Sequence, residues 1–315
     1  MSNTTSDILL LFLGVAGILM ALTLFGEILR AKVAPDGSNP VVETFMTRVH
    51  SWWAMVILLS LALLIGRIGI VVLFAFASFA ALRELMTMTS KSQADHMSLA
   101  VAFYIILPVQ YVLIWLGWSG MFMVFIPVYA FLLLPIVSAL RGDANRFLVR
   151  VAETQWGLMI AVFCASNVPA LMTIQIEGYP HERALLLIAF LVLVVQFGDL
   201  LDFFFGRRIG RTKIAAGISP KTYEGVICGV GSAMLIGALL AWITPFGIIG
   251  AMAMAGVASL VGMFGNIVFA AIKRDRGIKD WSHLIPGQGG VADQLDSVVF
   301  AAPIFYQLTL YFWGA

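Results

Sequence analysis

Long apolar runs alternate with short polar segments along the whole chain. Because a bilayer core of roughly 30 Å is crossed by about 20 apolar helical residues, these runs are candidate membrane spans. Lipid cannot satisfy open backbone groups, so such runs must be helical. The second and third runs are short and could form one helical hairpin that enters the bilayer less deeply. The pattern predicts an all-α, polytopic integral membrane protein with about ten transmembrane helices, at about 7–29, 52–66, 69–83, 98–116, 120–140, 155–173, 184–205, 224–242, 246–272 and 297–313.

The distribution of basic residues tests this number of spans. Of the 19 Lys and Arg residues, only Arg67 and Arg183 fall outside five polar segments. With ten spans, all five segments lie on one side of the membrane, and the positive-inside rule places that side in the cytoplasm and both termini outside. Nine spans with one re-entrant segment is the alternative. The expected location is a bacterial inner membrane, with these cytoplasmic segments: 30–51, 83–97, 141–154, 206–223 and 273–296.

Composition agrees with a membrane protein. Hydrophobic residues make up 61% of the chain and charged residues 11%, and the mean hydropathy of +0.98 excludes a soluble globular protein. No linker is long enough to separate domains. The chain is therefore predicted to be a single membrane domain, 1–315, with N-terminal helices in 1–183 and a C-terminal half in 184–313. The polar segment 31–51 is interpreted as a turn-rich cytoplasmic connection.

Prolines and glycines modify the expected helices. Pro108, Pro127, Pro135 and Pro169 lie inside the fourth, fifth and sixth runs and predict kinks. Glycines spaced along 247–265 favour close contact between helices, which would also permit a homodimer. Cys164 and Cys228 lie in apolar runs and are interpreted as small core residues.

The segment 273–296, KRDRGIKDWSHLIPGQGGVADQLD, contains a concentration of charge that is unusual in this chain. Eight charged residues and His283 gather around a turn rich in glycine. Charge this dense beside membrane-spanning sequence is costly unless it is solvated or coordinates a ligand. The composition indicates an anionic, phosphate-bearing ligand together with a divalent metal.

Asp293 and Asp296 are expected to open the last helix with both carboxylates on one face. Carboxylate oxygens are the ligands that Mg²⁺ prefers, and a metal at this position could bridge nucleotide phosphates. The preceding turn, LIPGQGG, would add free N–H groups close to the metal. The alternative is that both acids are helix N-terminal residues favoured by the helix dipole.

The segment 206–223 is the second candidate phosphate site. It carries Arg207, Arg208, Arg211, Lys213 and Lys221 among glycines and hydroxyl residues. Glycine lets backbone donors approach a phosphate closely, and the cations neutralise its charge. The alternative is a polybasic patch on anionic lipid headgroups.

Asp199 and Asp202 lie at the end of the seventh run. An intramembrane acid is a functional-site hypothesis by default, and residues three apart share one helix face. The alternative is ion pairing with Arg207 or Arg208.

At this point the C-terminal segment resembles the signature of phosphatidate cytidylyltransferases (CDP-diacylglycerol synthases). That signature runs Ser-x-x-Lys-Arg, then Lys-Asp after four residues, then a Pro-x-His-Gly-Gly turn and Asp-Arg-x-Asp. From Lys273 onward the matching positions keep its spacing and are Lys273-Arg274, Lys279-Asp280, Pro286-Gly287-Gln288-Gly289-Gly290 and Asp293-Gln294-Leu295-Asp296. Ala271 stands near the Ser position, one residue closer to Lys273 than in the signature.

Two upstream elements extend the resemblance to about residues 185–313. The family's upstream Asp matches Asp199, before Gly206. Its Ser-Pro-x-Lys-Thr-Trp-Glu-Gly loop matches 219–225 with one residue missing.

Three positions depart from the family pattern. Gln288 stands where the family has His, Gln294 where it has Arg, and Asn266 where it has an acid that serves the metal. Asn offers Mg²⁺ an oxygen but no charge. The chain therefore looks like a divergent bacterial paralogue.

The resemblance implies Mg²⁺-dependent transfer of a cytidylyl group from CTP to phosphatidic acid, with a second monovalent or divalent cation as a further expectation. The implied metal ligands are Asp293, Asp296, Asn266 and Asp199. The implied catalytic residues are Asp293, Lys273 and Asp280. CTP or lipid phosphate would be bound by Ser219, Lys221, Thr222, Arg274, Lys279, Gln288, Gly289 and Gly290.

Other functions remain as alternatives. One is the same chemistry on another lipid phosphate, such as an ether or prenyl lipid. Another is a catalytically weakened protein that binds lipid or nucleotide, or a transporter, although no inverted hydropathy repeat is evident. The basic loops lack the interleaved aromatic residues of strand-binding grooves, so no nucleic-acid partner is expected.

Overall fold

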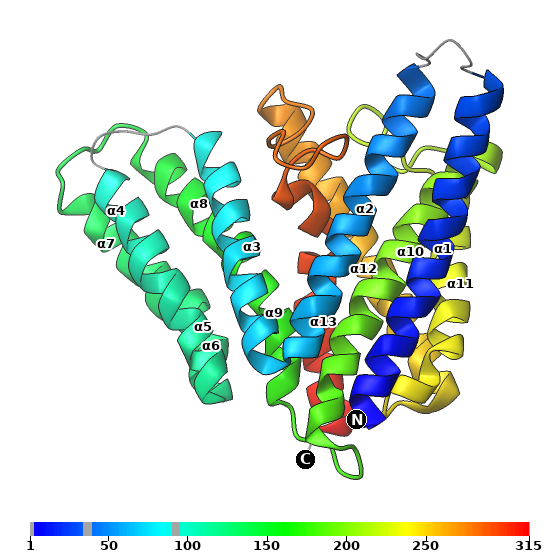
Figure 1. Ribbon diagram of the computed structural model, residues 1–315. Helices are drawn as coiled ribbons and strands as arrows, with labels where there is room; N and C mark the ends of the chain where they lie inside the picture. The colour runs from blue at the N-terminus through cyan, green and yellow to red at the C-terminus, as the bar shows by residue number, and fades with distance from the viewer. Residues whose placement is uncertain (1–2, 34–39, 90–94, 315) are drawn as a thin grey trace.

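The computed structural model describes residues 3–33, 40–89 and 95–314, and this part of the chain is helical without a β-sheet (Figure 1). The two ends of the chain lie at the same end of the helix bundle. The helices are α1 (Asn3–Val33), α2 (Pro40–Ile65), α3 (Arg67–Thr87), α4 (His96–Val101), α5 (Leu107–Leu116), α6 (Ser119–Val124), α7 (Phe131–Ala139), α8 (Phe147–Leu158), α9 (Ala165–Ala170), α10 (Ala184–Ile209), α11 (Tyr223–Leu239), α12 (Gly247–Asp275) and α13 (Val291–Trp313).

The helices confirm a polytopic membrane protein. Within the described residues, nine helical segments are long and apolar enough to cross a membrane. Some of these segments consist of two consecutive helices, as α4 and α5 do in His96–Leu116. The eighth predicted span, 224–242, is α11, which is shorter than these nine segments: it has 17 residues and therefore measures about 25 Å. It packs between α10 and α12 and runs alongside them (Figure 1).

Two predictions about the N-terminal spans are wrong. The runs 52–66 and 69–83 do not form a shallow hairpin, because α2 and α3 extend to 26 and 21 residues and each is long enough to span a membrane. The segment 31–51 is not mainly a connection, because α2 already begins at Pro40. Proline suits the first turn of a helix, where its missing N–H has no intrahelical partner. Residues 34–39 lie outside the described part of the chain.

The predicted kinks take the form of π-helical turns. Such turns occupy Ala102–Ile106, Phe125–Ala130 and Met159–Cys164. Each either contains a proline or lies within five residues before one. A proline ring clashes with the carbonyl four residues earlier and removes one hydrogen bond. A π-turn accommodates this interruption without ending the helix.

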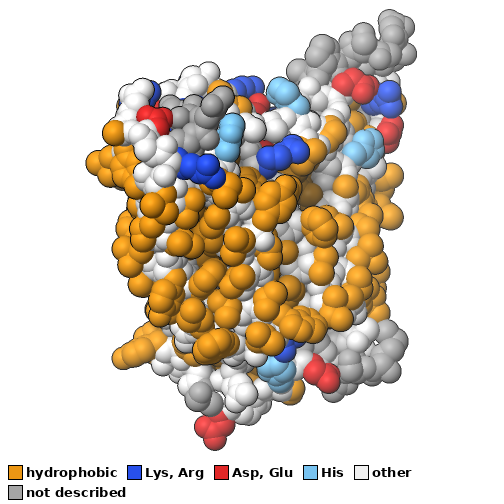
Figure 2. All heavy atoms as spheres, turned by 90° about the vertical axis from the view of Figure 1, so that its left-hand side faces the viewer, with side chains coloured by type: hydrophobic (Ala, Val, Ile, Leu, Met, Phe, Trp, Pro, Cys, Tyr) orange, Lys and Arg blue, Asp and Glu red, His pale blue; other side chains and the backbone are white. Residues whose placement is uncertain are grey.

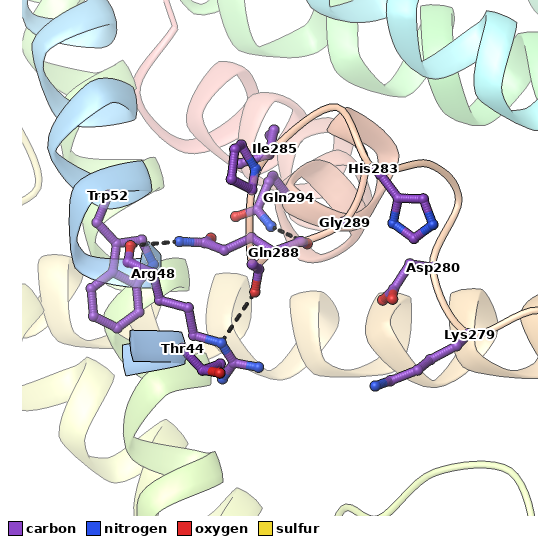
Figure 3. Close-up of a pocket in the computed structure, with 12 residues that line it drawn as sticks. Thr44, Arg48, Trp52, Lys279, Asp280, His283, Ile285, Gln288, Gly289 and Gln294 are labelled. Carbon is purple, nitrogen blue, oxygen red and sulfur yellow. Dashed lines mark hydrogen bonds between the residues drawn. The ribbon is translucent and has the colours of Figure 1, made fainter. Parts of the chain in front are cut away.

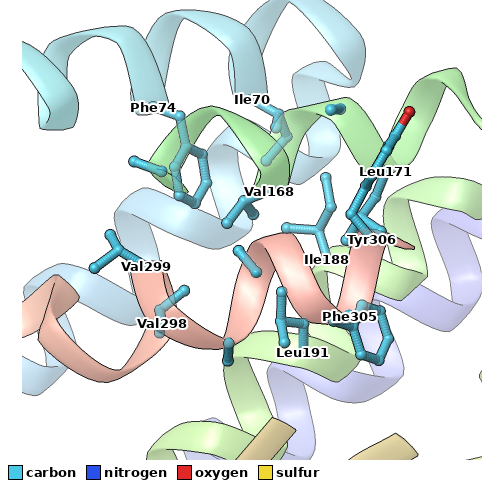
Figure 4. Packing of buried hydrophobic residues seen from close by; sticks show 14 of the residues in the cluster. Ile70, Phe74, Val168, Leu171, Ile188, Leu191, Val298, Val299, Phe305 and Tyr306 are labelled. Atoms are coloured by element: carbon cyan, nitrogen blue, oxygen red, sulfur yellow. The ribbon is translucent and has the colours of Figure 1, made fainter. Parts of the chain in front are cut away.

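Helix α13 lies at the centre of the molecule and contacts α3, α9, α10 and α12. Figure 4 shows its buried Val298, Val299 and Phe305 among side chains of these neighbours. The Phe305 and Phe190 rings are 5.9 Å apart between centroids. Because α13 carries the candidate acids at its beginning, both halves of the chain fix the position of the site.

A broad apolar belt covers the side of the bundle seen in Figure 2, and charged side chains gather mainly at its upper rim. Large apolar side chains of the spans are strongly exposed, and the exposed fractions of Tyr104 and Leu132 are 77% and 60%. Large apolar side chains exposed in such numbers are expected of a surface that faces lipid.

Candidate active site

An acid–lysine cluster joins α10, α12 and the segment that precedes α11. The Lys221 ammonium group forms an ion pair with the Asp199 carboxylate at 3.1 Å and a second with Asp202. The Asn266 amide of α12 donates to the same Asp199 oxygen, Oδ1, at 2.6 Å. Asp199 therefore pairs with Lys221, and not with the neighbouring arginines that the alternative interpretation proposed.

The two carboxylates determine the ionisation of Lys221. Burial by itself lowers the pKa of this amine, but attraction to Asp199 and Asp202 outweighs burial and raises the pKa above its ordinary value. Lys221 is consequently a fixed positive charge at neutral pH and is no proton acceptor there.

A second ion pair lies at the start of α13. The Lys273 ammonium group donates to Asp293 Oδ1 at 2.9 Å. The other oxygen of Asp293, Oδ2, accepts hydrogen bonds from the backbone N–H groups of Trp281, at 3.0 Å, and Gly290, at 2.8 Å. Asp293 thus caps the helix that it opens, as the sequence predicted, and it also holds the 281–290 segment against α12.

Asp296 connects the two ion pairs. It lies one turn beyond Asp293 and interacts electrostatically with Asp199, Lys273 and Lys221. When all groups are ionised, the combined cluster carries four carboxylates and two ammonium groups, which leaves two negative charges uncompensated. Its members are Asp199, Asp202, Asp293, Asp296, Lys221 and Lys273.

The hard oxygen donors of this cluster fit a divalent cation such as Mg²⁺. In the described part of the chain, no three His, Cys, Asp or Glu side chains are already arranged to hold a metal. Instead, lysines neutralise the carboxylates, so a metal would share those oxygens with the ammonium groups or displace them.

The glycine turn before α13 has most of its N–H groups occupied. The N–H groups of Gln288 and Gly289 both donate to the Ile285 carbonyl at 3.1 Å, and that of Gly290 donates to Asp293. The expectation of free N–H groups is therefore wrong for these three residues. Gly287 and Gly289 have φ angles of 73° and 90°, a region that non-glycine residues rarely adopt.

Two hydroxyl residues of the 206–223 segment shape the segment itself. Thr222 is the N-cap of α11, and its Oγ1 accepts from the Gly225 N–H at 3.2 Å. Ser219 Oγ accepts from the Lys221 N–H at 3.3 Å. The guanidinium groups of Arg207 and Arg208 lie over aromatic rings of their own helix, at 4.8 and 5.8 Å from the centroids.

The N-terminal half contributes contacts that sequence reasoning missed. Glu84 of α3 is 2% exposed, and its carboxylate accepts from Ser282 Oγ at 2.7 Å and from the N–H groups of Val291 and Ala292 at 3.1 and 2.8 Å. It thus satisfies two N–H groups at the start of α13. A Cβ atom at Gly290 would collide with this carboxylate. The signal was present in the sequence, because Glu84 is a lone acid among apolar residues near the end of α3.

Helices α8 and α2 also contact the charged segment 273–296. Glu153 of α8 forms an ion pair with Arg276 at 2.6 Å. On α2, Ser51 Oγ donates to the Pro286 carbonyl at 2.7 Å and Arg48 Nε donates to the Gly287 carbonyl at 3.1 Å. The site is therefore built from both halves of the chain.

A pocket of ≈ 490 Å³ opens beside this turn (Figure 3). Its lining includes four predicted residues, Lys279, Asp280, Gln288 and Gly289, together with Thr44, Arg48 and Trp52 of α2. The predicted Arg274 is exposed at the end of α12 and is not part of this lining. Most of the predicted residues thus lie in or beside two neighbouring groups, the acid–lysine cluster and this pocket. The predicted residues that belong to neither group are Ser219, Thr222, Arg274 and Gly290.

Comparison with known proteins identifies the family. Residues 46–312 match the cytidylyltransferase family, so the chain belongs to it and is a nucleotidyltransferase enzyme. The chain is 34% identical over 272 residues to the uncharacterized protein YnbB of Escherichia coli (strain K12), covering 84% of this chain and 87% of that protein.

Named enzymes also match. The chain is 36% identical over 133 residues to the phosphatidate cytidylyltransferase of Synechocystis sp. and 31% identical over 147 residues to that of Haemophilus influenzae. These two alignments cover 41% and 44% of this chain and 44% and 51% of those enzymes. The chain therefore aligns with about half the length of each. The family implies a nucleotide and a lipid as substrates of a membrane-bound enzyme.

Proposed function

We propose that the protein transfers the cytidylyl group of CTP to the phosphate of phosphatidic acid and forms CDP-diacylglycerol and pyrophosphate. A phosphate oxygen of the lipid attacks the α-phosphorus of CTP and forms a P–O bond. The bond from that phosphorus to the bridging oxygen of the β-phosphate breaks, and pyrophosphate leaves with the electron pair. The observation that supports this proposal best is the convergence of two lysine–carboxylate pairs and Asn266 beside a pocket of ≈ 490 Å³.

Positioning and charge stabilisation dominate such a reaction. Lys273 and Lys221 are held by carboxylates, so they present fixed positive charge to the phosphates without rearrangement. Lys279 and Arg274 are exposed at the rim and would be the first to meet an incoming phosphate. Asp280 would orient Lys279 across the pocket, and Ser219 and Thr222 would donate to phosphate oxygens while keeping their loop contacts.

Mg²⁺ would be held by Asp293, Asp296, Asn266 and Asp199, and when bound it would neutralise phosphate charge and align the reacting groups. The carboxylate and amide oxygens that the cluster gathers support this assignment. A second cation would have the same carboxylates as ligands.

We further propose a bacterial inner membrane location with the site in the cytoplasm. The loop before α11 and the loop between α12 and α13, which carry residues of the site, lie at the bundle end opposite the two termini (Figure 1). The basic segments 206–223 and 273–296 gather there, as the positive-inside rule requires of a cytoplasmic face. CTP is available on that side.

Another lipid phosphate, such as an ether or prenyl lipid, is the second candidate substrate. Gln288 and Gln294 favour it, because these neutral residues line the pocket and bond to each other, Gln294 Nε2 donating to the Gln288 carbonyl at 3.0 Å. Labelled CTP incubated with the reconstituted protein and a panel of lipid phosphates separates the candidates. Label in phosphatidic acid supports the first proposal, and label in another lipid alone supports the second. No label in any lipid contradicts both and leaves a weakened lipid or nucleotide binder.

Replacing Asn266 by Asp is expected to leave activity equal or raised at saturating Mg²⁺. Asn266 donates to Asp199 at 2.6 Å, so the new carboxylate faces another carboxylate and the two repel each other unless a cation lies between them. The variant is therefore expected to gain more thermal stability from Mg²⁺ than the wild type does. Initial rates and melting temperatures across a Mg²⁺ titration test this. Asn145→Asp is the matched control, because it makes the same chemical change at an exposed position. A loss of activity in Asn266→Asp at saturating Mg²⁺ would contradict the ligand assignment.

A further inference from the structure

One face of α2 forms a wall of the pocket that the C-terminal motif does not supply. Thr44, Arg48 and Trp52 line the pocket at intervals of four residues, which places them on one helix face. Figure 3 shows the Arg48 guanidinium group and the Lys279 ammonium group on opposite sides of the pocket, with the Trp52 ring beside Arg48. Residues more than 200 positions apart in the sequence thus face the same space.

The turn before α13 orients Arg48. Its Nε donates to the Gly287 carbonyl at 3.1 Å, while its own carbonyl accepts from Gln288 Nε2 at 2.9 Å. This reciprocal pair fixes the helix and the turn to each other. It uses only one guanidinium nitrogen, so the two terminal nitrogens can bind a ligand.

The pocket has an excess of positive charge. Among the described residues, neither Arg48 nor Lys279 forms an ion pair with an acid. Asp280 is the acid in the pocket lining, and His283 adds a further positive charge when protonated. Gln288 and Gln294 are neutral and bond within the turn, so the cation on this wall comes from α2.

We propose that Arg48, opposite Lys279, binds a phosphate group of a substrate, and that α2 is therefore part of the substrate site. The inference rests on the proposed function, since that reaction brings two phosphate-bearing substrates to this pocket. A guanidinium group suits a phosphate because its N–H donors can bind two oxygens at once. The phosphate belongs either to the lipid or to CTP, and separate measurements with each ligand distinguish them.

Two substitutions separate charge from positioning. Arg48→Gln removes the charge but keeps an amide that can donate to the Gly287 carbonyl, whereas Arg48→Lys keeps the charge and loses the planar fork. If Arg48 binds phosphate, Arg48→Gln raises the KM for one of the two substrates about tenfold. Arg48→Lys raises the same KM about threefold at most. Arg141→Gln is the matched control, because it removes the charge of an exposed arginine that does not line the pocket and should leave both KM values unchanged.

The KM values for phosphatidic acid and for CTP are measured separately with purified protein in nanodiscs. A raised KM for the lipid alone assigns the Arg48 site to the lipid phosphate, and a raised KM for CTP alone assigns it to the nucleotide. Unchanged KM values for both substrates overturn the inference. The inference is also overturned if the KM of Arg48→Gln is closer to the wild-type value than the KM of Arg48→Lys is, because that order indicates a positioning role only.

Equilibrium binding tests the inference without turnover. The nanodisc protein is titrated with CTP and with phosphatidic acid, and diacylglycerol, which lacks the phosphate, serves as the comparison lipid. Weaker binding of one phosphate ligand by Arg48→Gln upholds the inference even if wild-type protein transfers no label, a result that would contradict the proposed function alone. Binding of both ligands with wild-type affinity, or binding of neither by the wild type, overturns the inference.

Discussion

Replacing Asp293 by Asn is expected to lower turnover by about 100-fold or more while the protein still folds and inserts. One carboxylate oxygen pairs with Lys273 and the other accepts two backbone N–H groups. The amide keeps the size of the side chain and an acceptor oxygen, but it removes the negative charge. Lys273 then lacks its partner, and the proposed metal loses a charged ligand.

Rates of label transfer from CTP to lipid, at equal amounts of purified wild-type and variant protein, measure this effect. Asp275→Asn is the matched control, because Asp275 is a 74% exposed acid in the same charged segment and pairs only with the adjacent Arg276. The control should keep wild-type turnover. Near wild-type turnover in Asp293→Asn would refute both its metal role and its catalytic role.

Replacing Glu84 by Ala is expected to destabilise the protein by about 3 kcal/mol and to lower activity. The change leaves the N–H groups of Val291 and Ala292 and the hydroxyl of Ser282 without their buried acceptor. The beginning of α13 then loses its anchor on α3, and the candidate acids of α13 lose their fixed position.

The melting temperature of the purified protein should fall by roughly 5 °C or more, and kcat should fall more than KM rises. Arg83→Ala changes the adjacent, exposed residue and should have neither effect. A melting temperature and kcat equal to those of the wild type would show that Glu84 does not hold the site together.

The sequence predicted most of the membrane architecture because hydrophobic runs and basic loops report directly on lipid contact. It failed for α2, where Glu43, Arg48 and His50 made the first turns of a helix look like a loop. A helix that extends beyond the bilayer core carries polar residues, so hydropathy alone cannot locate its beginning.

Motif spacing predicted the residues of the candidate site but not their contacts. The pairing of Lys221 with Asp199 depends on how the 206–223 segment folds back on α10. The contributions of Glu84 and Arg48 depend on long-range packing, since each contacts residues about 200 positions or more away. Pairings across such separations leave no local pattern in one sequence.

The most direct test of the central proposal uses CTP labelled either in its α-phosphate or in its γ-phosphate. Purified protein in vesicles of phosphatidic acid is supplied with each labelled nucleotide, with Mg²⁺ or with an excess of chelator. Cytidylyl transfer predicts α-label in the lipid and γ-label in released pyrophosphate, both only with Mg²⁺. The absence of α-label from the lipid, or γ-label in the lipid, would contradict the proposed reaction. Equal transfer under chelation would contradict the role assigned to the metal.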